Sequence, residues 1–103
     1  MIDAAVKLDD QFAPAYVSRA VQRGLRGDFR GAKVDIQSAL SLTPDSADAL
    51  FISATIAMKL NDVASAKADF QKAIENAPMD WPHRYETKQI LEQLNKSGSR
   101  TLP

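Results

Sequence analysis

The sequence predicts an all-α fold of stacked antiparallel helix pairs, and three observations carry this prediction. First, residues 13–44 of the 103-residue chain align without gaps on residues 47–78, at an offset of 34 residues. Second, helix-breaking residues divide each copy into two stretches of helical length. Third, alanines recur at equivalent places in both copies. A fixed period of this size is typical of repeat units that stack to bury a continuous core.

Ten of the 32 aligned positions are identical, and half of these are alanines. Small side chains at fixed places let two helix backbones approach closely, and larger neighbours fill the space between them. The identical pairs are Ala13/Ala47, Ala15/Ala49, Ala20/Ala54, Asp28/Asp62, Ala32/Ala66, Lys33/Lys67, Asp35/Asp69, Gln37/Gln71, Ala39/Ala73 and Pro44/Pro78. The expected larger neighbours are Tyr16, Ile36 and Leu40 in the first copy and Leu50, Phe70 and Ile74 in the second.

The first repeat, residues 13–46, is predicted to be two helices joined by a tight turn. The stretch over residues 13–26 has no internal breaker. Gly27 then ends this helix, because glycine adopts the left-handed conformation common at helix C-termini. Asp28 can cap the next helix with its carboxylate, and this second helix should run to about Leu42.

The second repeat, residues 47–80, follows the same plan. A helix is expected over residues 47–60, and a second one is expected to end near Asn76. Asn61 stands where Gly27 stood, and asparagine is the next best residue for a left-handed helix end. Asp62 takes the capping place.

The two ends of the chain predict further helical material. Residues 1–10 match the end of the second helix of a repeat, so we expect a partial preceding repeat and hence a segment of a longer array. After the second repeat, residues 81–96 should form a capping helix, with Asp80 as its cap and Pro82 in its first turn. Residues 97–103 are predicted to be a short disordered tail.

These two copies resemble tetratricopeptide repeats in period, in the places of small residues and in the closing proline. The resemblance implies an α-solenoid, wound as a right-handed superhelix, whose first helices line a concave groove for peptides or helices of partner proteins. The residues that carry it are Tyr16, Arg19, Ala20, Arg23, Ala32, Ile36, Ala39 and Pro44, then Leu50, Ser53, Ala54, Ala57, Ala66, Phe70, Ala73 and Pro78.

The resemblance also implies which residues would face the groove, and most of them are apolar. They are Val17, Val21, Gly24 and Leu25 in the first repeat and Phe51, Thr55, Met58 and Lys59 in the second. Packing within the repeats does not obviously absorb Phe51 and Met58. Exposed apolar patches usually bind a partner, but the terminal helix or upstream repeats could cover both side chains instead.

Three arginines, Arg19, Arg23 and Arg26, follow one another at spacings of four and three and share a helix face. They are candidates for an anion site that would take an acidic peptide, a phosphate or RNA. The alternative is that their stems pack against a helix over residues 2–9 and their guanidinium groups pair with acids such as Asp3, Asp9 or Asp35.

Composition argues against most other classes of function. Thirteen basic and thirteen acidic residues cancel, which is unlike a nucleic-acid binder. Cysteine is absent and His83 is the only histidine, so we predict no catalytic residues, no metal site and no cofactor. No secretory signal or membrane-spanning run is evident, and the compartment cannot be read.

The function predicted from the sequence is therefore a non-catalytic protein–protein interaction module that holds an apolar or amphipathic peptide or helix in its groove. The alternative is a structural, self-associating solenoid that forms a homodimer through the groove or the open N-terminal edge. Anion or RNA binding through the arginines is the third interpretation.

Overall fold

Residues 12–100 are described by a computed structural model, with side chains described to residue 96. They form five α-helices and contain no strand. The helices are α2 (Ala13–Leu25), α3 (Phe29–Leu42), α4 (Ala47–Lys59), α5 (Val63–Asn76) and α6 (Arg84–Arg100). The all-α prediction is confirmed. The predicted partial repeat over residues 1–10 lies outside the described residues.

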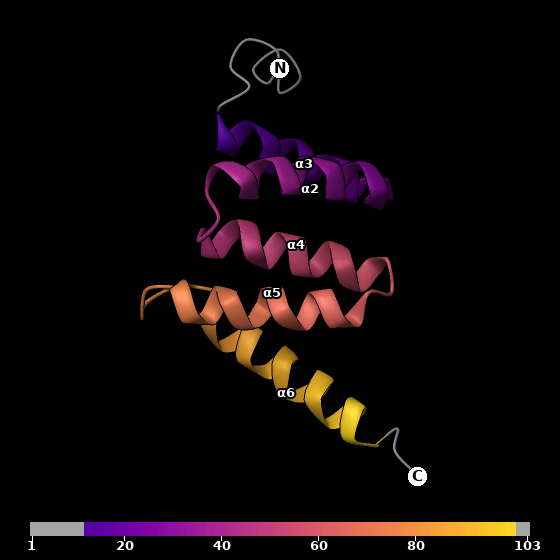
Figure 1. The fold of residues 1–103 in the computed structure, drawn as a ribbon, viewed down its shortest axis with the longest axis vertical. Coiled ribbons are helices and arrows are strands. Elements are labelled where there is room, and N and C mark those ends of the chain that lie inside the picture. The colour runs from indigo at the N-terminus through magenta and orange to yellow at the C-terminus, as the bar shows by residue number, and fades with distance from the viewer. Residues whose placement is uncertain (1–11, 101–103) are drawn as a thin grey trace.

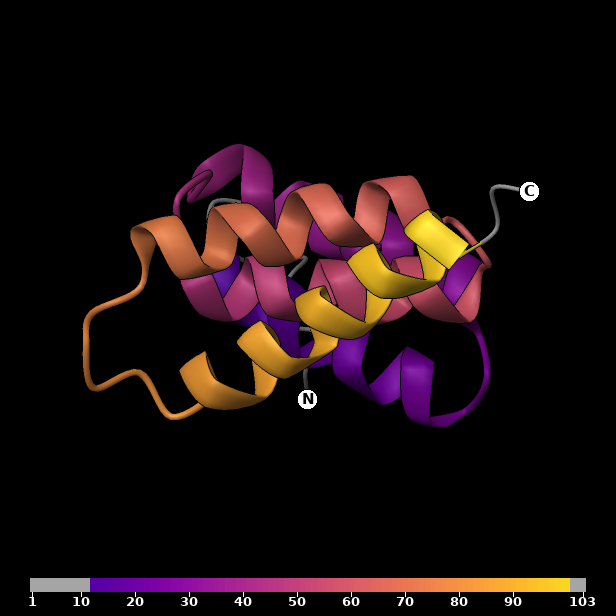
Figure 2. The same cartoon turned by 90° about the horizontal axis from the view of Figure 1, so that it is seen from below.

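Helices that follow one another along the chain pack side by side (Figure 1). α2 packs on α3 and α4 on α5, and α3 joins the two pairs through α4. α6 packs on α5 but crosses it diagonally (Figure 2). α6 lies at the end of the stack, on the far side of α5 from α4 (Figure 1).

Both predicted turns have the expected backbone. Gly27 has φ +86° and Asn61 has φ +63°, so both lie in the left-handed region. The next residue caps the following helix in each case: the Asp28 carboxylate accepts from the Gly31 N–H, and the Asp62 carboxylate accepts from the Ser65 N–H. One local rule therefore ends one helix and begins the next in both pairs.

Six of the ten alanines in the identical pairs are fully buried, as expected for small residues that let helix backbones approach each other. They are Ala20, Ala32, Ala39, Ala54, Ala66 and Ala73. Ile36 and Phe70, which occupy equivalent positions in α3 and α5, are the largest fully buried apolar side chains.

The C-terminal helix differs from its prediction at both ends. It begins at Arg84 rather than Trp81, and it continues to Arg100, so residues 97–100 belong to a helix and not to the predicted tail. Asp80 does not cap it; the first turn closes instead on the His83 carbonyl, which accepts from the Thr87 N–H and hydroxyl. Residues 101–103 lie outside the described residues.

The start of α6 is displaced because Trp81 is held by a residue far away in sequence. Its indole N–H donates to the Asp48 carboxylate at 2.8 Å, and the ring is buried. Arg84 fixes the same loop by donating to the carbonyls of Ala77 and Pro78. These contacts hold residues 81–83 in a turn, in which the Arg84 N–H donates to the Trp81 carbonyl at 3.1 Å.

Within the described part of the chain, no helix is long and apolar enough to cross a membrane.

Candidate functional site

A groove runs between α2 and α4, with α3 contributing to its floor. We call it the α2–α4 groove. Its lining is almost wholly apolar, and its volume is about 270 Å³. The ten lining residues are Ala20, Val21, Gly24, Leu25, Phe29, Phe51, Ile52, Thr55, Ile56 and Lys59.

Helical spacing places the residues of the two rims. Phe51, Thr55 and Lys59 follow one another every four residues and so form one row along α4. Val21 and Leu25 form the facing row on α2. Both are exposed, Leu25 to 83%, which means that the rim on α2 presents its apolar side chains to solvent rather than to the core.

Six of the eight residues predicted to face a groove line this one: Val21, Gly24, Leu25, Phe51, Thr55 and Lys59. The other two lie elsewhere. Val17 is half-buried against the core of the first helix pair. Met58 is half-buried in a cluster that includes Phe70 and Leu91, so α5 and α6 cover it.

Phe51 belongs to the groove and to the core at the same time. Its ring stacks on the His83 imidazole with the ring centres 4.5 Å apart, and it meets the rings of Phe70 and Trp81 edge-on. The segment that leads into α6 therefore covers much of Phe51, as one of the two sequence-based alternatives proposed. His83 is thus half-buried and packed, and its Nδ1 lies 3.2 Å from the Glu86 carboxylate.

Four lining residues were not predicted to face the groove: Ala20, which was expected to pack between helices, and Phe29, Ile52 and Ile56. Phe29 comes from the first turn of α3, and its counterpart in the second repeat is Val63, which is 42% exposed. The groove residues were predicted only from the first helix of each repeat, so Phe29, which belongs to the second helix of its repeat, could not be among them. Ile56 is buried. In the sequence it is one of many apolar residues of the helix expected over residues 47–60, so nothing there assigned it to the groove.

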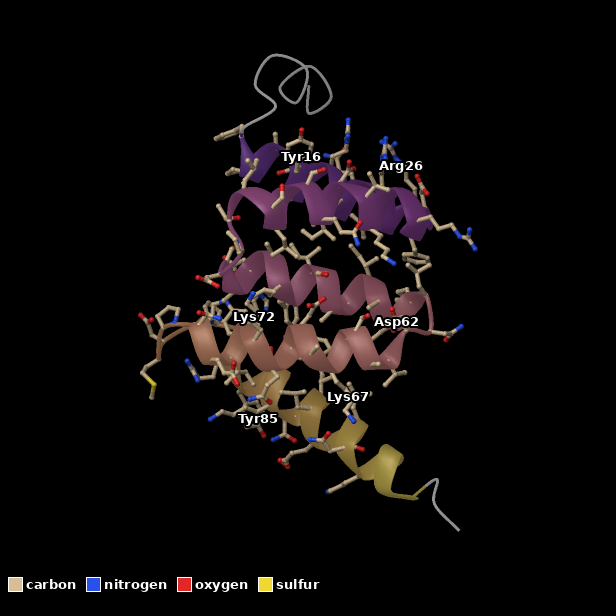
Figure 3. All side chains as sticks on the ribbon, in the orientation of Figure 1. Tyr16, Arg26, Asp62, Lys67, Lys72 and Tyr85 are labelled. Carbon is tan, nitrogen blue, oxygen red and sulfur yellow. The ribbon has the colours of Figure 1, made fainter. Side chains whose placement is uncertain are left out.

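The three arginines do not form a free anion site. Arg19 makes a two-pronged contact with the buried Asp35, with Nε at 2.9 Å and Nη2 at 2.7 Å from its carboxylate oxygens. Arg23 Nε lies 3.5 Å from the same carboxylate. Arg26 is exposed and lies on the edge of α2 away from α4 (Figure 3). The alternative interpretation, pairing with Asp35, accounts for Arg19 and Arg23.

A second hollow, between α3, α4 and α5, is lined by both polar and apolar side chains. Its carboxylates are already engaged: Asp69 accepts from the Ser53 hydroxyl at 2.7 Å, and Asp62 accepts from Ser65. The hydrogen bonds from Ser65, with the nearby Lys33 ammonium, lower the pKa of Asp62 below its ordinary value. These contacts serve helix capping and pairing within the molecule.

The described residues contain no cluster of three His, Asp or Glu side chains that could hold a metal ion. A scan against protein-family models and a search of curated proteins each found no match for this chain.

Proposed function

We propose that this chain is a tetratricopeptide-like module of a protein-interaction solenoid, wound as a right-handed superhelix and capped by α6. Its function would be to hold an apolar or amphipathic segment of a partner protein. The resemblance of its two copies to that repeat family supports the architecture. The observation that carries the function is the apolar α2–α4 groove with its exposed rim.

The exposed rim favours binding over simple core packing. Val21 and Leu25 expose 41% and 83% of their surface on one row of α2. Exposed apolar side chains that line a concave surface together are typical of partner sites. We propose no enzymatic role, because Thr55 and Lys59 are the only lining residues with a hydroxyl or an amine, and no His, Asp or Glu lines the groove beside them to activate either group.

The test uses the exposed rim and leaves the core intact. A phage library of random dodecapeptides would be selected on immobilised protein and on the Val21→Glu, Leu25→Glu double variant. We expect clones that the wild type retains and the double variant does not, because two carboxylates would face the apolar floor. Circular dichroism should show that both proteins are equally helical, and Val34→Glu, on an exposed side chain of α3, is the matched control.

Retention of the same clones by all three proteins would contradict the proposal. Self-association, the second function predicted, would appear as a concentration-dependent molar mass in light scattering. If the Leu25→Glu change abolished such a dimer and no peptide bound, the groove would be a homodimer interface instead.

A further inference from the structure

The α2–α4 groove carries one kind of charge only. Of its ten lining residues, Lys59 alone is charged, and no acidic side chain is among them. Lys59 is exposed in the last turn of α4. Among the described residues, no carboxylate lies within ion-pair distance of its ammonium group. An apolar floor with a single unpaired cation at one end complements a ligand with apolar side chains and one carboxylate.

The size of the groove narrows the ligand further. Its volume of about 270 Å³ lies below the range of about 300–1,000 Å³ that is usual for small-molecule pockets. The row from Phe51 to Lys59 spans eight residues, or about 12 Å of helix. This length and volume suit two neighbouring aliphatic side chains of a peptide, with the next residue beside Lys59.

Gly24 lies in the wall of the groove, within α2. A Cβ atom added there would meet no atom within 4 Å, so the hollow reaches the backbone of the helix. Glycine inside a helix is less favourable than alanine by roughly a factor of two to five in the helical equilibrium. A larger side chain at this position would fill the groove without a clash, which provides a clean way to close it.

We propose that the groove selects a partner segment with two aliphatic side chains followed by an aspartate or glutamate, whose carboxylate pairs with Lys59. This inference rests on the proposed function, because it specifies the partner of the same groove. A positive residue in the last turn of a helix also stabilises the helix itself through its dipole. The experiment must therefore measure the preference of the ligand and not only the effect of removing Lys59.

The experiment analyses the phage clones that bind the wild type but not Gly24→Leu. We expect these clones to share two aliphatic residues and an adjacent Asp or Glu. The best clone would be made as a peptide with an amidated C-terminus, so that no terminal carboxylate contributes, and compared with its Asp→Asn and Asp→Lys versions by fluorescence anisotropy. Asp→Asn should weaken binding about two- to five-fold, the range of an exposed ion pair.

Charge reversal of the protein provides the decisive comparison. Lys59→Glu should reverse the order, so that the peptide with lysine binds more tightly than the one with aspartate, while Lys59→Gln should bind both about equally. Circular dichroism would confirm that both variants remain folded. Both effects should shrink as salt rises.

The outcomes separate the two proposals. If clones bind the wild type specifically but show no acidic preference, or if Lys59→Glu leaves the order unchanged, the inference about Lys59 is wrong and the proposed function stands. If clones distinguish the wild type from the Val21→Glu, Leu25→Glu variant but not from Gly24→Leu, this inference fails and the proposed function stands. If no clone distinguishes the wild type from either variant, both fail.

Discussion

The two helix pairs use the same positions for different polar contacts. In the first pair, Arg19 and the fully buried Asp35 form an ion pair that Arg23 extends. In the second pair, the residues 34 positions later are Ser53 and Asp69, joined by one hydrogen bond in a half-exposed site. The same aspartate thus joins two helices in both units, once as an ion pair and once through a neutral donor.

The first helices of the pairs differ in a second way. α2 has an apolar side and a polar side, whereas α4 is apolar nearly all round. α4 lies inside the stack, where α2, α3, α5 and the segment before α6 contact it. Among the described helices, α2 packs on two others and α4 packs on three, so the neighbours of each helix explain the difference better than the shared template does.

The contrast between the Arg19–Asp35 ion pair and the Ser53–Asp69 hydrogen bond can be tested by removing the charge of each aspartate, and this test has the largest expected effect. Asp35→Asn keeps the shape but removes the buried negative charge that Arg19 and Arg23 contact. It should lower the free energy of unfolding by roughly 2–3 kcal/mol, since Arg19 still reaches water. Asp69→Asn should cost less than about 1 kcal/mol, because an amide oxygen can still accept from Ser53. Urea titration of both variants measures the difference, and equal costs would contradict it.

Truncating the aligned residues Val17 and Phe51 would sharpen the contrast between edge and interior. Phe51→Ala should lower the free energy of unfolding by about 2–3 kcal/mol, because the ring contacts three other rings. Val17→Ala should cost about 1 kcal/mol, since fewer methyl groups lose their contacts. Thermal unfolding followed by circular dichroism would show this, and a larger shift for Val17→Ala would disprove the assignment of Phe51 to the core.

The two turns offer a smaller and more symmetrical comparison. Gly27→Ala should lower the free energy of unfolding by about 1 kcal/mol, because a Cβ is strained at φ +86°. Gly27→Asn, which copies the second turn, should cost about half of that, since asparagine tolerates this conformation. A cost for Gly27→Asn equal to that of Gly27→Ala in urea unfolding would show that asparagine has no advantage here.

The smallest expected effect is on the stability of the fold at acidic pH. The hydrogen bonds from Ser65 lower the pKa of Asp62 in the folded chain. The carboxylate therefore stabilises the fold above its unfolded pKa of about 3.9, and this contribution is lost as the pH falls through the lower folded value. Unfolding of Asp62→Asn should accordingly depend less on pH between 5 and 2 than that of the wild type. Parallel curves for the two proteins would contradict this.

Most of the fold could be predicted because local chemistry specifies it. Gly27, Asn61 and the two capping aspartates mark the turns within a few residues, and the alanines mark the close approaches. The start of α6 could not be predicted in the same way. Pro82 is suited to a first helical turn, but a hydrogen bond from Trp81 to Asp48, 33 residues away, holds the segment in another path.

The candidate site was predictable in part for the same reason. The spacing of residues within α2 and α4 predicted the two rims of the groove. It could not show that residues before and within α6 cover Phe51 and Met58, or that Phe29 of α3 reaches the floor, because these contacts join distant parts of the chain. The spacing of Arg19 and Arg23 likewise allowed two interpretations, an anion site or pairing with acidic side chains. Only the position of Asp35 in the fold distinguishes them.

The position of Trp81 also supplies an optical probe of the molecule. It is the only tryptophan of the chain, and its ring is buried where the segment before α6 meets α4. Its fluorescence emission should therefore shift to longer wavelength when this segment detaches, whereas far-ultraviolet ellipticity reports all five helices together. If the fluorescence shift precedes the loss of ellipticity during denaturation, the C-terminal helix leaves before the two pairs unfold.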